Sequence, residues 1–259
     1  MNKIFTCLLT AIILLPATNS FAQMDMDPAP GHKKLKIGAY VAPTMSWMRP
    51  TTSKTDDGQY APENMGNRLG FIYGIMGAYN FAANYAFVTG IQVNMTGGKI
   101  YTKRVAGNTY DANVVNSADF DYHLSYLEIP AAIKLQTNAF SGFRFFGQAG
   151  LTLGINIAKN ADYEVQYNDE SGNNEQAKGD REKIKGALAI APAMLQMNIG
   201  LGTEYAFTSR LSAYIGIFFN NGFLPDATNP KKYKMSYDLP FSDGNTRLNN
   251  LALRIGMFF

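Results

Sequence analysis

The chain has 259 residues and a formal net charge of +3, and it contains no run rich in lysine and arginine, which argues against nucleic acid as a partner. Charged residues make up only 17% of the chain and aromatic residues 13%, so large apolar faces must be buried or placed in lipid. After the amino-terminal leader, no segment has about 18 consecutive apolar residues, which excludes a membrane protein built from helices.

The first 22 residues resemble a cleavable secretory signal peptide, with a lysine near the start and a small-x-small motif at the end. Its apolar segment, residues 4–15, is too short to span a membrane. Cys7 is the only cysteine of the chain and lies in this segment, so the mature chain would have no disulfide and no thiolate metal site. Residues 23–34 are predicted to be a flexible periplasmic lead-in, followed by one domain at 35–259.

Eight segments of this domain alternate apolar and polar side chains with a period of two, which predicts β-strands with two unlike faces. In chain order they are 35–47, 68–79, 85–102, 122–136, 143–158, 187–205, 210–223 and 249–259. Most of them exceed the roughly 9–11 residues that a tilted strand needs to cross the hydrocarbon of a bilayer.

The connections between these segments alternate in length without exception. The short ones are 80–84, 137–142 and 206–209, and the long ones are 48–67, 103–121, 159–186 and 224–248. Tight periplasmic turns and long outer loops produce this rhythm in an up-and-down barrel, whereas a Greek-key sandwich has no reason to keep it. The sequence therefore predicts an all-β fold, an eight-stranded antiparallel up-and-down transmembrane β-barrel.

Alternation alone would also fit a soluble barrel of the lipocalin type, with an apolar interior. Two features favour a barrel whose apolar face points outward into lipid. The apolar face is too continuous for a small core that must leave room for a ligand, and aromatic residues crowd beside every short turn. These are Tyr79, Phe81, Tyr85, Phe87, Phe143, Phe145, Tyr205, Phe207 and Phe259, and they predict a periplasmic aromatic girdle. The residues expected in the opposite, outer girdle are Trp47, Tyr101, Tyr122, Tyr126, Phe219 and Phe223.

The polar face, which would line the lumen, carries six charged residues in mid-strand: Lys36, Glu128, Lys134, Arg144, Glu204 and Arg254. Isolated charges in a narrow lumen are costly, so we predict that Glu128 and Glu204 each contact a lysine or an arginine. Side chains roughly fill the interior of an eight-stranded barrel. A structural plug of ion pairs is therefore expected, and a small conducting or gating network is the alternative.

Residues 126–135 read Tyr-Leu-Glu-Ile-Pro-Ala-Ala-Ile-Lys-Leu, and the mid-strand Pro130 predicts a bulge or a missing ladder bond. Together with the glycine-rich segment 198–205 and the final strand of the Leu-x-Leu-x-Ile-Gly type, they resemble the PorT-like outer-membrane barrel family of Gram-negative bacteria. The resemblance covers nearly the whole mature chain. It implies a monomeric outer-membrane protein without enzymatic activity, with a structural or binding role or an association with secretion and assembly.

Two alternatives remain, a narrow porin and an enzyme that modifies lipid A. The second rests on His123 and Ser125, because lipid A deacylase barrels also use a His-x-Ser pair, and Asp119 and Asp121 lie nearby in sequence. With His32 as the only other histidine, we expect no metal site, and no motif indicates a cofactor. The expected partners are outer-membrane lipid, lipopolysaccharide and secretion or assembly proteins.

Overall fold

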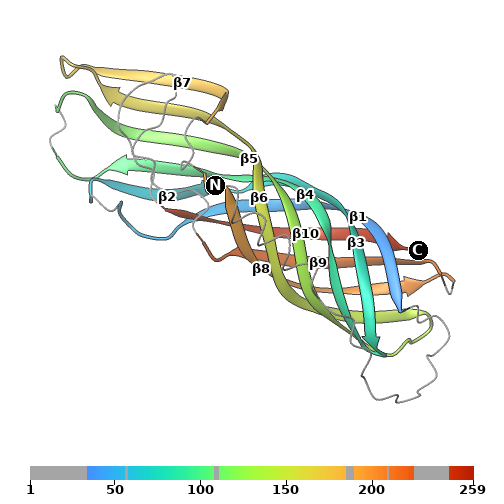
Figure 1. The fold of residues 1–259 in the computed structure, drawn as a ribbon. Helices are drawn as coiled ribbons and strands as arrows, with labels where there is room; N and C mark the ends of the chain where they lie inside the picture. Colours follow the sequence, from blue (N-terminus) through green and yellow to red (C-terminus); the bar gives the residue numbers. More distant parts are fainter. Residues whose placement is uncertain (1–33, 56–57, 108–110, 185–189, 209, 225–244) are drawn as a thin grey trace, which may run out of the picture.

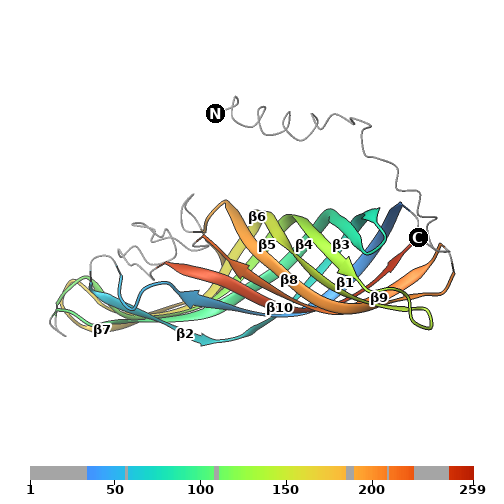
Figure 2. The same cartoon turned by 90° about the horizontal axis from the view of Figure 1, so that it is seen from below.

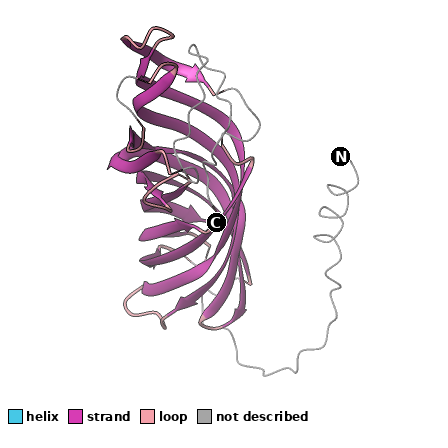
Figure 3. Cartoon of the chain, turned by 90° about the vertical axis from the view of Figure 1, so that its left-hand side faces the viewer, coloured by secondary structure: helices cyan, strands magenta, loops and turns pink. Residues whose placement is uncertain are grey.

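A computed structural model of the chain describes residues 34–55, 58–107, 111–184, 190–208, 210–224 and 245–259. The expected signal peptide and nearly all of the expected lead-in lie outside these residues. The described part consists of strands and their connections, with no helix that is long and apolar enough to cross a membrane (Figure 3).

Ten antiparallel strands form one sheet (Figure 1). They are β1 (Leu35–Pro50), β2 (Tyr60–Gly66), β3 (Arg68–Ala82), β4 (Tyr85–Arg104), β5 (Val114–Gln136), β6 (Phe143–Asn168), β7 (Asn174–Lys183), β8 (Ala193–Ala206), β9 (Ser212–Gly222) and β10 (Thr246–Phe258). Eight of them close a ring in the order β1-β3-β4-β5-β6-β8-β9-β10, because β10 pairs back with β1. The predicted eight-stranded up-and-down barrel is confirmed.

The two faces of the ring point as predicted. The aliphatic positions face outward and are exposed, for example Leu253 at 41% and Ile255 at 47%, whereas Asn94 and Asn198 on the opposite face are at most 1% exposed. The aromatic residues beside the short turns are also exposed and contact one another, with 4.6 Å between the ring centroids of Phe143 and Tyr205. These contacts form an aromatic girdle around the end of the barrel that carries the short turns.

Pro130 interrupts the ladder between β5 and β4, as its position in the sequence predicts. Thr89 pairs with Ala131 and Gln92 pairs with Glu128, but no ladder pair connects the residues between them. The Thr89 hydroxyl donates instead to the Pro130 carbonyl at 2.8 Å. A proline lacks the N–H that the ladder needs, so a side chain supplies the missing connection.

Close approach of the strands explains a glycine on the inner face of β6. A Cβ on Gly150 would lie 2.2 Å from the carbonyl oxygen of Ala131 and 2.4 Å from the Cα of Ala132. Real Cβ atoms do not approach backbone atoms so closely, so only glycine fits between β5 and β6 here.

Beyond the ring, β4, β5 and β6 continue and are joined by β2 and β7 into a five-stranded sheet in the order β2-β4-β5-β6-β7. This outer sheet lies at the end of the molecule opposite the carboxy terminus (Figures 1 and 2). The connections 48–67 and 159–186 were expected to be loops, and this expectation was wrong because they contain β2 and β7. Pro62 in β2 and the many charged side chains of β7 limit further pairing at the two open edges.

The apolar face of β5 changes sides where the strand leaves the ring. In residues 127–135 the odd positions are aliphatic and point outward, whereas in residues 119–125 the odd positions are polar and the even positions are buried apolar residues. Tyr122 and Tyr126 are therefore fully buried inside, and their expected place in an outer girdle was wrong. Trp47 and Phe219 do meet on the outer face, with 6.2 Å between ring centroids. The reversal marks where lipid gives way to water on β5.

Candidate functional site

Glu204 holds a cluster of buried polar groups in the lumen. Its carboxylate accepts hydrogen bonds from Lys36 Nζ at 2.7 Å, from Lys134 Nζ at 2.6 Å and from the Ser212 hydroxyl at 2.8 Å. The side chains of Lys134 and Glu204 are 4% and 3% exposed. Breaking an ion pair that is so well shielded from water is costly, because it leaves a buried charge without a counter-charge. The cluster connects β1, β5, β8 and β9 across the inside of the ring.

Within the described part of the chain Glu128 forms no ion pair with a lysine or an arginine, so our expectation for this residue was wrong. Its carboxylate accepts hydrogen bonds from the amides of Gln92 and Asn94, the latter at 2.7 Å, and the Tyr40 hydroxyl donates to Gln92. The register explains this choice of partners, since Gln92 on β4 lies directly opposite Glu128 on β5. Two neighbouring amides are enough to satisfy one carboxylate with neutral donors.

Arg254 is 2% exposed and lies between two aromatic rings, with its guanidinium carbon 4.5 Å from the centroid of Tyr40 and 4.1 Å from that of Phe218. Contacts of this kind stabilise a cation through the electron-rich face of the ring. Arg144 is half-buried, and it makes no ion pair in the described part of the chain although it lies opposite Glu204. Of the six lumen charges, Lys36, Lys134 and Glu204 thus form one cluster, whereas Glu128, Arg144 and Arg254 each have different neighbours.

The remaining lumen is filled by amides and apolar side chains. Gln148, Asn198, Asn220 and Asn250 form a chain of hydrogen bonds across four neighbouring strands. Among the described residues, the cavity beside Lys134 and Arg254 measures about 10 Å³, which is the smallest space that holds one water molecule.

Toward the outer sheet the lumen contains a continuous apolar cluster that includes Met48, Ile100, Phe120, Tyr122, Tyr126 and Met194, each at most 1% exposed. Both halves of the interior are therefore packed with side chains.

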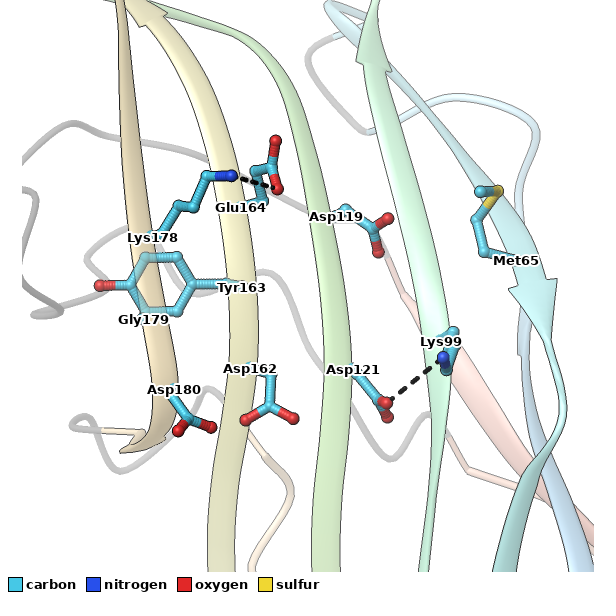
Figure 4. Close-up of a pocket in the computed structure, with 10 residues that line it drawn as sticks. All are labelled: Met65, Lys99, Asp119, Asp121, Asp162, Tyr163, Glu164, Lys178, Gly179 and Asp180. Atoms are coloured by element: carbon cyan, nitrogen blue, oxygen red, sulfur yellow. Dashed lines mark ion pairs between the residues drawn. The ribbon is translucent and has the colours of Figure 1, made fainter.

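The outward face of the outer sheet carries an open groove of about 670 Å³ (Figure 4). Its lining residues come from β2, β4, β5, β6 and β7: Met65, Lys99, Asp119, Asp121, Asp162, Tyr163, Glu164, Lys178, Gly179 and Asp180. This lining contains five carboxylates and two lysines. Lys178 pairs with Glu164 at 3.1 Å, and Lys99 pairs with Asp121 at 3.6 Å. Partial burial raises the pKa of Asp119; Lys99 opposes this shift, and the carboxylates of Glu164 and Asp121 add to it.

A chain of hydrogen bonds joins three strands at the base of this groove. Arg68 donates to Asp121 Oδ1 at 2.6 Å and to His123 Nδ1 at 2.5 Å. Because a guanidinium can only donate, the proton of His123 is on Nε2, which lies 2.8 Å from Asp162 Oδ2. Arg68 reaches this face past Gly97, where a Cβ would lie 2.9 Å from its Cδ. Both nitrogens of the imidazole are therefore engaged.

Asp162 completes this chain and connects it to β7. Its other oxygen accepts the backbone N–H of Arg181 at 2.6 Å. Partial burial raises the pKa of Asp162, but the hydrogen bonds from Arg181 and His123 outweigh it and hold this pKa below the ordinary value. Sequence reasoning missed Arg68 and Asp162. A sign of a solvent-facing strand was nevertheless detectable, because polar residues alternate with apolar ones at Asp119, Asp121 and His123.

Asp121, His123 and Asp162 place one potential metal-ligand atom each within 4.8 Å of one another. Arg68 already donates to two of these three side chains, so a divalent cation would have to displace these hydrogen bonds. The arrangement acts as a set of ion pairs that fixes β3, β5 and β6 to one another.

A profile of the outer membrane protein beta-barrel domain family matches residues 21–227. None of the curated proteins compared matches significantly. Among solved structures, neisserial surface protein A is 13% identical, with 88% of this chain and 98% of that chain covered and a TM-score of 0.41. Ail of Yersinia pestis, in complex with the heparin analogue sucrose octasulfate, is 12% identical (88% and 100% covered, TM-score 0.37). OprG of Pseudomonas aeruginosa is 11% identical (89% and 98% covered, TM-score 0.38).

Proposed function

Since the chain belongs to the outer membrane protein beta-barrel domain family, we propose that it is a non-conducting, non-enzymatic barrel that binds a partner at the cell surface. The protein is located in the outer membrane. Short turns of such barrels face the periplasm and long connections face outward, so the outer sheet is extracellular. The PorT-like resemblance supports a binding role connected with secretion or assembly.

The observation that carries the proposal is the packed interior. Arg254 lies between Tyr40 and Phe218, and the cavity beside it is about 10 Å³. Hydrated ions need a continuous aqueous path, and the apolar cluster of the outer half offers none within the described residues. A narrow porin would instead require polar, water-accessible walls along the whole lumen.

Recordings in planar lipid bilayers test this part of the proposal. We expect no unitary conductance steps from the wild-type protein over a broad voltage range. The double variant Arg254→Ala, Phe218→Ala widens the small lumen cavity but leaves the outer apolar cluster in place, so it should not conduct either, after its folding has been checked by heat-modifiable migration in gels. Reproducible steps from the wild type would overturn the proposal in favour of the narrow porin.

The geometry of His123 supports the non-enzymatic part. A histidine that activates a serine needs a free ring nitrogen to accept the hydroxyl proton. Arg68 occupies Nδ1, and Nε2 faces Asp162, so neither nitrogen is left for Ser125. Mass spectrometry of lipid A from cells with the wild-type protein, with Ser125→Ala and without the protein should give identical acylation and phosphorylation patterns. A pattern that depends on Ser125 would show that the enzyme alternative is right.

The outer groove supports a binding role, because it is of a size that holds ligands or peptide segments and is built on a rigid sheet. We expect a pull-down from gently solubilised envelopes to recover secretion or assembly proteins. The variant Asp119→Asn should lose them, because it removes a groove charge that makes no hydrogen bond to the Arg68 chain. Glu170→Gln, in the exposed β6–β7 turn, is the matched control. Equal recovery with both variants would contradict a role for the groove.

A further inference from the structure

Two arginines face each other on the outer surface, and neither has a partner among the residues that the structure describes. Arg49 on β1 lies directly opposite Arg247 on β10, and both side chains are exposed on the outward face. Within the described part of the chain neither guanidinium has a hydrogen bond or an ion pair. Like charges directly opposite each other destabilise an antiparallel pair. An anion between the two groups would turn this repulsion into attraction.

The position of this arginine pair relative to the lipid identifies the anion. One row closer to the membrane centre, Trp47 lies opposite Asn249 and stacks on Phe219 with 6.2 Å between ring centroids. One row further in, the exposed Met45 and Leu251 lie opposite each other. Tryptophan on the surface of a membrane protein marks the level of the lipid headgroups. Two residues further along a strand add about 6.6 Å, which places the arginines beside the phosphates of the outer leaflet.

From this register we infer that Arg49 and Arg247 form a binding site for the phosphate group of an outer-leaflet lipid. A guanidinium presents a planar fork of N–H groups that matches the oxygens of a phosphate, and two such forks surround one phosphate from both sides. A phosphomonoester carries about −1.5 to −2 charges near neutral pH, which balances the two arginines. Acyl chains of the same lipid would lie along the row of Met45 and Leu251.

Other basic groups near this level differ from the arginine pair. Arg68 and Lys99 both contact Asp121, at 2.6 Å and 3.6 Å, so their charge is already balanced within the protein. The inference therefore concerns these two residues and not a general basic belt. It depends on the outer-membrane location and is independent of what the groove binds.

Binding measurements on the delipidated protein in detergent test the site. The probes are bis-phosphorylated lipid A, the same lipid A after dephosphorylation, and inorganic phosphate, with native mass spectrometry as the readout. One charge-assisted contact contributes enough to change affinity about tenfold or more, so Arg49→Gln or Arg247→Gln should each weaken lipid A binding about tenfold. The double variant should bind phosphorylated lipid A no better than wild type binds the dephosphorylated form.

The control is Arg210→Gln, which removes an exposed arginine near the opposite end of the barrel and should leave binding unchanged. The variant Arg49→Lys, Arg247→Lys keeps both charges but loses the forks, and we expect intermediate binding. Lipid A binding by the double glutamine variant at wild-type strength would overturn the inference. Inorganic phosphate binding as tightly as lipid A would overturn the assignment to a lipid.

A second measurement separates a binding site from a merely structural role. Without lipid, Arg247→Gln relieves the repulsion between the two arginines, so its melting temperature should exceed that of the wild type by up to about 3 °C. With saturating lipid A the order should reverse, because only the wild type retains both contacts. A variant that is less stable than wild type in both conditions would contradict the inference.

Discussion

The substitution Glu204→Gln tests how much the buried ion pairs contribute to the barrel. It preserves the size of the side chain but removes the negative charge that lies 2.7 Å from Lys36 Nζ and 2.6 Å from Lys134 Nζ. Lys134 would be left as a 4% exposed cation without a counter-charge, whereas Lys36, at 12%, can regain some water. Removing one partner of a buried pair costs about 3–5 kcal/mol, so we expect a loss of roughly 4 kcal/mol in the free energy of unfolding.

Urea unfolding in lipid vesicles measures this loss, with the fluorescence of Trp47, the only tryptophan, as the signal. The double variant Glu204→Gln, Lys134→Met removes the stranded cation and should recover most of the stability. Glu63→Gln, an exposed carboxylate on β2, is the matched control and should change little. A loss below about 1 kcal/mol for Glu204→Gln, or additive effects of the two substitutions, would refute the reasoning, since interacting residues give non-additive effects.

Three further predictions concern strand packing and the outer sheet. Gly150→Ala should prevent correct closure of the barrel, because its Cβ would lie 2.2 Å from a backbone oxygen. Gly77→Ala is the control and should be tolerated, because the atom nearest to its Cβ would be 4.0 Å away. Heat-modifiable migration in gels compares the folding of the two variants. Phe120→Ala removes a ring stacked on two tyrosines and should make the outer sheet, but not the ring of strands, sensitive to limited proteolysis. Asp162→Asn should speed amide exchange in β7 at pH 7. In the wild type, faster exchange in β7 should appear only in acid, below the ordinary pKa of an aspartate, because the depressed pKa keeps Asp162 charged down to that range.

The eight strands of the ring were predictable because lipid on one side and a packed lumen on the other enforce strict alternation. β2 and β7 were not, because water contacts their side chains and no apolar period reveals them. β7 contains no large apolar residue at all. The predicted start of the sixth segment at residue 187 also differs from the start of β8 at Ala193, and residues 187–189 lie outside the described part.

The candidate sites were predictable only as far as the alternation of inward and outward positions along each strand determines them. Glu204 and Lys134 occupy inward-facing positions of their strands, so alternation alone places both in the lumen. Their side chains are long enough to meet there. The partner of Glu128 depended on the register between β4 and β5, which alternation does not reveal. Arg68 has the parity of an inward residue, yet it reaches the outer face past Gly97, and this detour depends on a neighbouring strand.

The reversal of faces on β5 has a consequence for how the protein sits in bilayers of different thickness. Sliding outward would bring Leu127 into water, and sliding inward would draw Ser125 and His123 into hydrocarbon, where polar side chains are increasingly unfavourable with depth. The outer interface therefore works as a fixed reference level. In a thinner or thicker membrane, the lipid should adjust around the periplasmic girdle while the extracellular sheet keeps a constant height above the cell surface.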